Sequence, residues 1–400
     1  MRKATLAFIF ALVAMDVLAM GIVIPVFPKL IESFEGGDTA RAARIYGAMS
    51  TAWAVMQFFS MPVLGMISDR FGRRPVILVS CLGLGLDFFV MALAPNVEWL
   101  FVGRIVSGIT AANISTAFAY ITDVTPPEKR AGSFGLVGAA FGVGFVVGPA
   151  LGGVLGGIDP RLPFWVAGTI GILNAAYGFF VLPESLAPEK RANFAWARAN
   201  PVGSLKLLRS HRELFGLALV LFLMNLAHYV LPSITVLYMS HRYGWSATAV
   251  GLVLALVGAC AMIVQGGLVR RVVPKIGERR ALAMGLLFGA TGFVIYGLAP
   301  TGAIFLVAVP VMSLWGFAMP SAQAIMTRHV SVSEQGQLQG ANASLASLAG
   351  IFGPGLFTQT FAATLGPMPG AAFILAALML LAAAAIGWRV TRGEPQASSA

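Results

Sequence analysis

The chain is dominated by uninterrupted apolar runs that are each long enough to cross a lipid bilayer. A membrane-spanning helix needs about 20 predominantly apolar residues, and twelve such runs follow one another along the sequence. Their apolar residues are continuous rather than alternating, which argues against an outer-membrane β-barrel. The expected spans are residues 5–27, 44–66, 75–94, 98–121, 131–154, 162–182, 213–238, 247–269, 280–298, 302–324, 338–363 and 370–389. The sequence therefore predicts an all-α membrane protein with twelve transmembrane helices.

The composition excludes most soluble functions. Of 400 residues, 58% are hydrophobic and 11% are charged, whereas a soluble domain carries about 25% charged residues. No GxxxxGK[ST] phosphate-binding loop is present, so direct drive by ATP is not expected. The two cysteines, Cys81 and Cys260, lie inside spans without metal-ligand spacing and are expected to be inert packing residues. We expect no catalytic residues, no metal centre and no cofactor, so the chain is not predicted to be an enzyme.

Basic residues divide unevenly between the two sets of loops. With a cytoplasmic N-terminus, 21 of the 27 Lys and Arg residues fall in cytoplasmic segments, five fall in the opposite loops, and Arg104 alone lies inside a span. This asymmetry predicts that both termini are cytoplasmic and that the basic face contacts anionic membrane lipid. No soluble basic domain is present that would bind nucleic acid. The first run is too long for a signal peptide and contains Asp16, so it is expected to be an uncleaved helix.

A polar stretch, residues 184–212, divides the chain into two halves of six runs each. It holds eight charged residues and is predicted to be a cytoplasmic linker between bundles formed by residues 1–183 and 213–400. Three anchors recur with one offset of 205 residues: Gly72 with Gly277, Gly135 with Gly340, and Gly148-Pro149 with Gly353-Pro354. This offset indicates a duplicated six-helix unit. Transporters built from repeats bind their substrate where the repeats meet, near the membrane midplane.

Leaving Cys and Tyr aside, four ionisable residues lie well inside the expected spans, away from their ends. They are Asp16, Asp87, Arg104 and His228. An ionised side chain at the bilayer centre costs about 2.5–3.5 kcal/mol on insertion scales, so we predict that these four residues couple proton movement to transport. No partner for Asp16 is evident in the sequence. The rise of a helix places Asp87 and Arg104 at similar depth, where they can meet either as a static ion pair or as a titrating pair. His228 is either a hydrogen-bonded core residue or a group that titrates near neutrality.

The loop after the second expected span carries a specific pattern, Gly65-Met-Ile-Ser-Asp-Arg-Phe-Gly-Arg-Arg-Pro75. Its charges can be paired and released as helices move, and a membrane anchor would explain only the basic residues. We predict gating roles for its charged residues Asp69, Arg70, Arg73 and Arg74. Asp123 and the turn at residues 126–130 either pair charges at the same inner gate or form a solvated loop. The pattern resembles the signature of the major facilitator superfamily.

The fifth expected span contains Gly144-Phe-Val-Val-Gly148-Pro149-Ala-Leu-Gly-Gly153. Glycines four residues apart lie on one helical face and allow close helix packing, and Pro149 removes one backbone hydrogen bond. Plain tight packing explains the glycines alone. The full string resembles the motif of drug–proton antiporters in that superfamily, which implies that Gly144, Gly148 and Pro149 act in gating by sealing the helix interface.

The resemblance is closer still to the tetracycline efflux branch and covers nearly the whole chain. The matching stretches are PVLGMISDRFGRRP, VGRIVSGITAA, GPALGG, LPES, IGERRAL and GQLQG followed by GP. This resemblance implies two six-helix bundles and the export of a tetracycline–divalent cation complex in exchange for protons. We expect the transporter to function as a monomer. It also implies functional roles for Asp16, Gln57, Asp69, Arg70, Asp87, Arg104 and Asp123. Among the polar residues inside spans, most are expected to make interhelical hydrogen bonds, and we predict that Gln57, Asn113 and Gln323 contact substrate.

Two departures from the branch bear on the substrate. Where the branch has a His in the eighth helix this chain has Ala261, and where it has an Asp in the ninth helix this chain has Gly289. His228 stands where the branch has no matching His. The leading hypothesis is proton-coupled efflux of an amphipathic drug across the bacterial inner membrane, plausibly a tetracycline. The alternatives are export of another drug or an endogenous metabolite, and a non-transporting membrane receptor.

Overall fold

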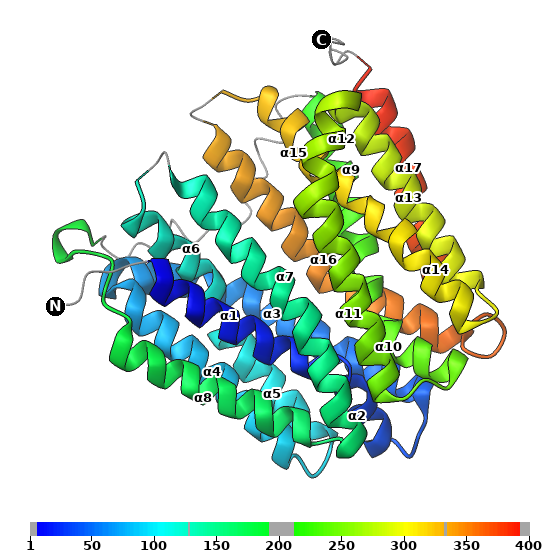
Figure 1. Cartoon of the computed structure of the whole chain (residues 1–400), viewed down its shortest axis with the longest axis horizontal. Coiled ribbons are helices and arrows are strands. Elements are labelled where there is room, and N and C mark those ends of the chain that lie inside the picture. Colours follow the sequence, from blue (N-terminus) through cyan, green and yellow to red (C-terminus); the bar gives the residue numbers. More distant parts are fainter. Residues whose placement is uncertain (1–5, 127–128, 192–211, 332–333, 393–400) are drawn as a thin grey trace. The chain divides into compact units, whose positions relative to one another are not determined.

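The computed structural model describes residues 6–126, 129–191, 212–331 and 334–392, drawn in colour in Figure 1. Every regular element in these ranges is helical, which confirms the all-α prediction. Most of the expected linker, residues 192–211, lies outside the described residues, as do residues 1–5 at the N-terminus and residues 127–128 of the expected gate turn. The division of the chain at residues 184–212 therefore stays a prediction.

The helices form two compact units. Unit 1 comprises residues 1–37, 52–200 and 245–255, and unit 2 comprises residues 38–51, 201–244 and 256–400. Two helices, α3 (Thr39–Phe71) and α11 (Ala247–Ile263), contribute residues to both units. The other helices of unit 1 are α1 (Leu6–Val23), α2 (Phe27–Phe34), α4 (Arg73–Leu93), α5 (Val97–Thr110), α6 (Asn113–Val124), α7 (Arg130–Ile158) and α8 (Leu162–Val181), followed by the short 3₁₀ turn η2 (Pro188–Lys190).

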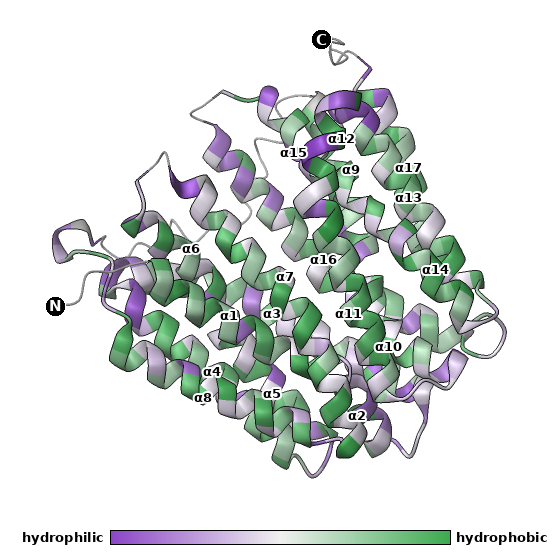
Figure 2. Cartoon of the chain, viewed as in Figure 1, coloured by the Kyte–Doolittle hydropathy of each residue, from purple (hydrophilic) through white to green (hydrophobic). Residues whose placement is uncertain are grey.

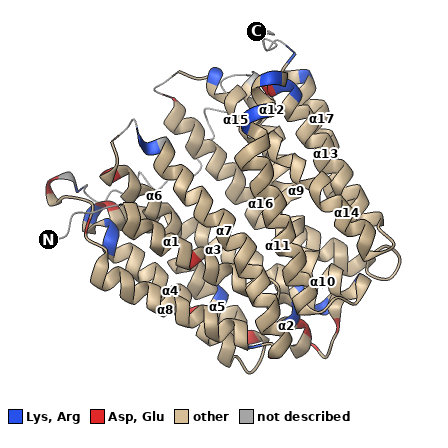
Figure 3. Cartoon of the chain, in the orientation of Figure 1, with Lys and Arg blue, Asp and Glu red and all other residues tan. Residues whose placement is uncertain are grey.

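Unit 2 contains two non-α turns within membrane spans. Its elements are α9 (Arg212–His228), α10 (Val230–Tyr243), the π-helical turn η5 (Val264–Leu268), α12 (Val269–Ile276), α13 (Glu278–Leu298), α14 (Gly302–Ser313), the 3₁₀ turn η6 (Leu314–Phe317), α15 (Ala318–Arg328), α16 (Gln335–Thr364) and α17 (Ala371–Val390). Hydrophilic residues gather at the helix ends, and the helix lengths between them are mostly hydrophobic (Figure 2). Most Lys, Arg, Asp and Glu residues also lie near the helix ends, and a few lie within helices of unit 1 (Figure 3).

Eleven segments of the described residues are long and apolar enough to cross a membrane. They correspond to eleven of the twelve expected spans, several of which are built from two helices in sequence, such as α5 with α6. The remaining expected span is α16, a helix of 30 residues. Its hydropathy is lower because it carries polar side chains such as Asn342, Ser344 and Gln359. Each of the twelve expected spans is therefore helical over most of its described length.

In unit 1, α1 packs against α7 and α8, and α4 packs against α8. Glycine permits the closest of these contacts. A Cβ atom added to Gly148 of α7 would lie 2.7 Å from the Cα of Gly21 in α1, and one added to Gly171 of α8 would lie 2.6 Å from the Cα of Gly85 in α4. Small residues let helix backbones approach closely where the lipid supplies no hydrophobic driving force. The sequence positions of these glycines thus influence which helices pair.

In unit 2, α13 packs against α17 and against α14, η6 and α15, and α9 packs against α16 and α17. Buried aromatic side chains fill the space between these helices. The rings of Tyr296 and Phe305 stack with centroids 4.1 Å apart, and Phe373 meets Tyr238 edge to face at 5.0 Å. Aromatic pairs in such geometries contribute about 0.5–1.5 kcal/mol beyond their buried area. These aromatic contacts join α10, α13, α14 and α17.

Candidate functional site

Asp16 lies in the middle of α1 and is completely buried in unit 1. Three polar side chains from three other helices surround its carboxylate. The amide of Asn113 donates to Oδ2 at 2.5 Å, the amide of Asn174 donates to Oδ1 at 2.9 Å, and the thiol of Cys81 lies 3.7 Å from Oδ2. No basic side chain is paired with Asp16 among the described residues. The carboxylate is therefore held by neutral donors in an apolar bundle.

Local backbone features position these donors. The helix of the fourth span breaks between α5 and α6, and Asn113 is the first residue of α6, where its side chain reaches α1. Asn174 comes from α8, and its amide is also 2.9 Å from the carbonyl oxygen of Leu12, one turn before Asp16. Cys81 comes from α4 and is fully buried. The sequence prediction that Cys81 is an inert packing residue missed its contact with Asp16.

Asp87 and Arg104 form an ion pair inside unit 1. The Nη2 atom of Arg104 donates to Oδ2 of Asp87, whose side chain is completely buried, while 17% of the Arg104 side chain is exposed. The guanidinium also lies over the ring of Phe27, 5.3 Å from its centroid. Gly103 leaves space for the carboxylate, because a Cβ atom there would lie 2.5 Å from Oδ1 of Asp87. The predicted meeting of Asp87 and Arg104 is confirmed.

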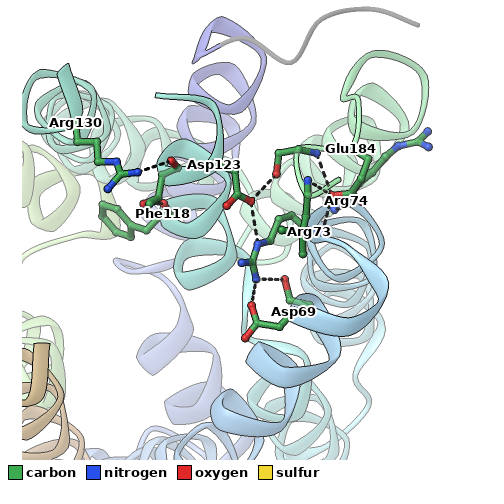
Figure 4. Close-up of polar contacts among 11 residues, drawn as sticks. Asp69, Arg73, Arg74, Phe118, Asp123, Arg130 and Glu184 are labelled. Atoms are coloured by element: carbon green, nitrogen blue, oxygen red, sulfur yellow. Dashed lines mark hydrogen bonds and ion pairs between the residues drawn. The ribbon is translucent and has the colours of Figure 1, made fainter. Parts of the chain in front are cut away.

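Arg73 is the centre of a network at the loop between α3 and α4 (Figure 4). Its guanidinium binds Asp69 one turn earlier, at the end of α3, and its Nε donates to Oδ2 of Asp123 at 3.1 Å. Asp123 lies at the end of α6 and also accepts a hydrogen bond from the hydroxyl of Ser185 at 3.0 Å. The structure thus brings Asp69, Arg73 and Asp123 together, as the gating hypothesis for this loop requires.

Glu184 completes this network, and the sequence analysis missed it. Its Oε1 accepts from the backbone N–H of Arg73 at 2.8 Å, and its Oε2 accepts from that of Arg74 at 3.2 Å, at the N-terminus of α4 (Figure 4). A helix N-terminus presents unpaired N–H groups and a partial positive charge that favour an anion. Gly72 has a φ of 110°, and a Cβ atom there would collide with the Glu184 carboxylate. The available signal was an acidic residue directly after the sixth span, in LPES, which the sequence analysis assigned to the linker.

The other basic residues of this region act separately. Arg74 donates to the carbonyl oxygen of Phe179 at 2.5 Å, near the end of α8. Arg70 is exposed and lies over the ring of Phe71, with 5.2 Å to the centroid. Arg130 donates to the carbonyl oxygens of Thr122 and Thr125, both at 3.2 Å, and so caps the C-terminus of α6. Within the described part of the chain, Arg73 is therefore the one predicted gating arginine of this region whose side chain joins α4 to both α3 and α6.

The glycine motif of α7 packs against two helices within unit 1. A Cβ atom on Gly144 would lie 2.6 Å from the Cγ1 atom of Val17 in α1, and Gly148 meets Gly21 of the same helix. On another side, Gly153 faces Gly251 of α11, and the hydroxyl of Thr248 donates to the Gly153 carbonyl oxygen at 3.1 Å. Pro149 lies inside α7 between these contacts. The motif therefore forms a tightly packed seam, in agreement with a sealing role that stays a prediction.

The predicted substrate contacts lie in different surroundings. Asn113 is buried and donates to Asp16, whereas Gln57 of α3 and Gln323 of α15 are half-buried and have no hydrogen-bond partner among the described residues. His228 ends α9 in unit 2 and is exposed, with Trp315 as its ring neighbour at 5.8 Å between centroids. The roles of Gln57, Gln323 and His228 stay predictions.

Comparison with known proteins identifies the family. The sequence profile described as Major Facilitator Superfamily matches residues 9–354, which is most of the chain. The chain belongs to the Major Facilitator Superfamily. It is therefore a multi-pass membrane transporter and not an enzyme, as the sequence analysis expected.

Several relatives of this chain are named as resistance proteins. The tetracycline resistance protein of class C from Escherichia coli is 38% identical over 94% of each chain, and that of class G from Vibrio anguillarum is 36% identical over 92% of this chain and 93% of its own. Among solved structures, the nucleoside transporter NupG superimposes with a TM-score of 0.79 at 11% identity, covering 97% of this chain and 99% of NupG. That similarity shows the fold alone.

Proposed function

We propose that this transporter exports a tetracycline from the bacterial cytoplasm across the inner membrane in exchange for protons. The observation that carries the proposal is the arrangement of unit 1, where two buried acids lie within the spans. Asp16 has no basic partner among the described residues, and Asp87 is paired with Arg104. The identity of 38% with a tetracycline resistance protein over 94% of both chains supports the choice of drug. The motif of α7 and the loop before α4 support the antiport class.

Asp16, Asp87 and Arg104 are the proposed proton-coupling residues of unit 1. A buried carboxylate that is held by neutral amides can be neutral or charged without losing every hydrogen bond, since an amide also offers an oxygen to a protonated acid. The Arg104 guanidinium favours the charged form of Asp87 when the pair is closed. Separation of the pair as α4 and α5 shift would favour proton uptake by Asp87, and re-formation would release the proton. His228 is the proposed additional titrating group of unit 2.

The network of Asp69, Arg73, Asp123 and Glu184 is the proposed inner gate. It joins the start of α4 to the ends of α3 and α6 and to the segment after α8, so its charge-assisted hydrogen bonds hold four elements in one arrangement. Arg70 and Arg74 flank it. Breaking the bonds of Arg73 would free the cytoplasmic ends of these helices, which is the motion that opening toward the cytoplasm requires.

Orientation, substrate form and assembly complete the proposal. The asymmetry of Lys and Arg supports a cytoplasmic location of both termini and contact with anionic lipid. The drug is exported as a complex with a divalent cation, the transporter acts as a monomer, and residues 184–212 link bundles formed by residues 1–183 and 213–400. The proposed substrate contacts are Gln57, Asn113 and Gln323.

The test is a drug panel in a susceptible bacterium that expresses the chain. We expect a raised inhibitory concentration for tetracyclines with wild type and none with Asp16→Asn, whose level in the membrane is checked by immunoblot. The matched control is Asp38→Asn, because Asp38 is exposed just before α3 and an amide oxygen can still accept the hydrogen bond from the backbone N–H of Arg41. Full resistance with Asp16→Asn, or no tetracycline resistance with wild type, would reject the proposal.

One observation favours a second candidate, export of another planar drug or a metabolite. The position of Gly289, where the resembling branch has an Asp, is covered: a Cβ atom there would lie 2.8 Å from Trp315 Cγ and 2.8 Å from Leu380 Cδ1. A relative named multidrug resistance protein 2, from Bacillus subtilis, is 28% identical over 85% of this chain and 84% of its own. Resistance to members of the panel other than tetracyclines would select this candidate.

A further inference from the structure

His228 lies at the middle of a membrane span with its side chain exposed. The span runs from Leu214 to Tyr243, and residue 228 is 14 residues from one end and 15 from the other. The exposed imidazole has no hydrogen-bond partner among the described residues. An ionisable side chain at this depth is costly in lipid, and such residues face a bundle interior or a water-filled space. The face of unit 2 that carries His228 is therefore expected to be accessible to polar ligands.

Trp315 is an aromatic neighbour of His228 and lies at the same depth. It is 13 residues from each end of the span Gly302–Arg328, and the two rings are tilted by 47° with centroids 5.8 Å apart. The indole is only half-buried, and its N–H has no hydrogen-bond partner among the described residues. An imidazole and an indole, both without a hydrogen-bond partner in the described part of the chain, thus meet at mid-span.

The indole is held in place from behind. Phe293 of α13 meets it edge to face at 5.5 Å, and Gly289 of the same helix lies directly against it. Any side chain at position 289 would displace the ring, because a Cβ atom there would already lie 2.8 Å from Trp315 Cγ. A large aromatic ring with a fixed orientation and a partly open surface is suited to stacking against a planar ligand.

Three interruptions of helical geometry surround this pair. The α-helix breaks at Tyr229, immediately after His228, and Trp315 belongs to the 3₁₀ turn η6. The π-helical turn η5 contacts η6, since a Cβ atom on Gly316 would lie 3.2 Å from Val264 Cγ1 and 3.5 Å from Gln265 Cγ. π-helical and 3₁₀ turns inside longer helices often mark functional positions, and discontinuous helices build the substrate sites of transporters.

We propose that His228 and Trp315 form a binding site in unit 2 for a planar, conjugated ligand with phenol or keto oxygens along one edge. The indole stacks on the ring system, and the imidazole exchanges a hydrogen bond with an edge oxygen. This inference rests on the proposed export function and deepens it, because it assigns the part of the drug that unit 2 recognises. It also gives His228 a binding role that does not require the His and the Asp that the resembling branch has at the positions of Ala261 and Gly289.

The binding test uses quenching of intrinsic tryptophan fluorescence in the purified full-length transporter. The probes are tetracycline and doxorubicin, two planar molecules with phenol and keto oxygens whose chromophores quench a nearby indole. We expect Trp315→Leu and His228→Phe to raise the Kd of both probes roughly two- to tenfold, which corresponds to one aromatic contact or one hydrogen bond. Trp315→Phe should retain the affinity because it keeps a stacking ring.

Matched controls are Trp99→Leu and His241→Phe, which change the same residue types at exposed positions outside the pair. Each variant is checked for a single peak in size-exclusion chromatography. Unchanged Kd values in Trp315→Leu and His228→Phe would overturn the inference, as would the absence of saturable quenching by either probe in wild type. Equal loss of affinity in the controls would also overturn it.

A transport measurement separates this inference from the proposed function. In everted membrane vesicles with an imposed pH gradient, the export proposal requires that tetracycline dissipates the gradient in wild type. If the gradient is unaffected while binding still depends on Trp315 and His228, the export assignment fails and the binding site stands. If tetracycline dissipates the gradient with the same KM in Trp315→Leu as in Trp99→Leu, the site is wrong and the export assignment stands.

Discussion

The carboxylate of Glu184 accepts a hydrogen bond from the backbone N–H of Arg73 at 2.8 Å, across 111 residues of sequence. The contact joins the segment after α8 to the first turn of α4. The same oxygen accepts from the backbone N–H groups of Ser185 and Leu186, both at 3.0 Å. One side chain therefore caps a helix and fixes the turn that follows another, beside the Arg73 guanidinium that binds Asp69 and Asp123.

Removal of this cap should destabilise unit 1. Glu184→Ala leaves the first N–H groups of α4 without their anion, and caps of this kind contribute about 0.5–2 kcal/mol. We expect a lower midpoint of thermal unfolding for the detergent-purified protein, and a smaller decrease for Glu184→Gln, which keeps one acceptor oxygen. Glu189→Ala, in the exposed turn η2, is the control. Equal midpoints for Glu184→Ala and Glu189→Ala would contradict the assigned cap.

The amide of Asn174 should be needed to position Asp16. Asn174→Leu keeps the approximate volume but removes the hydrogen bond to the carboxylate, and a hydrogen bond to a charged group contributes about 1.5–3 kcal/mol. We expect the rate of tetracycline–proton exchange in vesicles to fall by roughly tenfold or more. The control is Asn225→Leu, since the Asn225 amide donates to Leu221 of its own helix. A rate for Asn174→Leu that matches this control would remove Asn174 from the mechanism.

Variants of Asp87 and Arg104 distinguish a static ion pair from a pair that takes part in proton coupling. Arg104→Leu leaves a buried carboxylate without its partner, a change that costs about 3–5 kcal/mol in other proteins. The double variant Asp87→Asn, Arg104→Leu removes both charges, so its thermal stability should recover toward that of wild type. We nevertheless expect no tetracycline–proton exchange by this double variant, because it lacks the proposed coupling residues. Recovery of exchange together with stability would show that the pair is purely structural.

A carboxylate at position 289 should not fit this chain. Gly289→Asp forces a side chain against Trp315 and Leu380, and overpacking of this kind costs about 1–3 kcal/mol. We expect a lower unfolding midpoint, part of which is regained when Trp315→Leu is combined with it. Gly336→Asp in the first turn of α16 is the matched control, because a Cβ atom there meets no atom within 4 Å. Equal stability of the two single variants would contradict the packing of Trp315 on α13.

The spans could be predicted well from the sequence because hydropathy can be read along the chain without knowledge of how the helices pack. It also predicted that Asp87 and Arg104 meet, because both depths follow from counting residues along helices. The partners of Asp16 could not be assigned in this way: Asn113, Asn174 and Cys81 come from three helices whose rotation depends on packing. The cap by Glu184 depends on the loop conformation at Gly72, and a glycine in the sequence does not by itself specify that conformation.

Hydropathy also does not reveal the interruptions of the helices, because they depend on packing. Residues 314–317 and 264–268 lie within long apolar runs, so the sequence predicted single continuous spans there. The 3₁₀ and π turns reflect how α13 and the neighbouring helices pack. Consequently the sequence could not place Trp315 between His228 and Gly289, where the structure has it.

The central claim is that two buried acids couple drug export to proton entry. The most direct measurement is the proton flux of proteoliposomes that contain the purified transporter and an imposed pH gradient, before and after tetracycline is added. The account predicts that the drug dissipates the gradient with wild type, and that neither Asp16→Asn nor Asp87→Asn responds although both are folded. Undiminished drug-dependent proton flux in the double variant Asp16→Asn, Asp87→Asn would contradict the account.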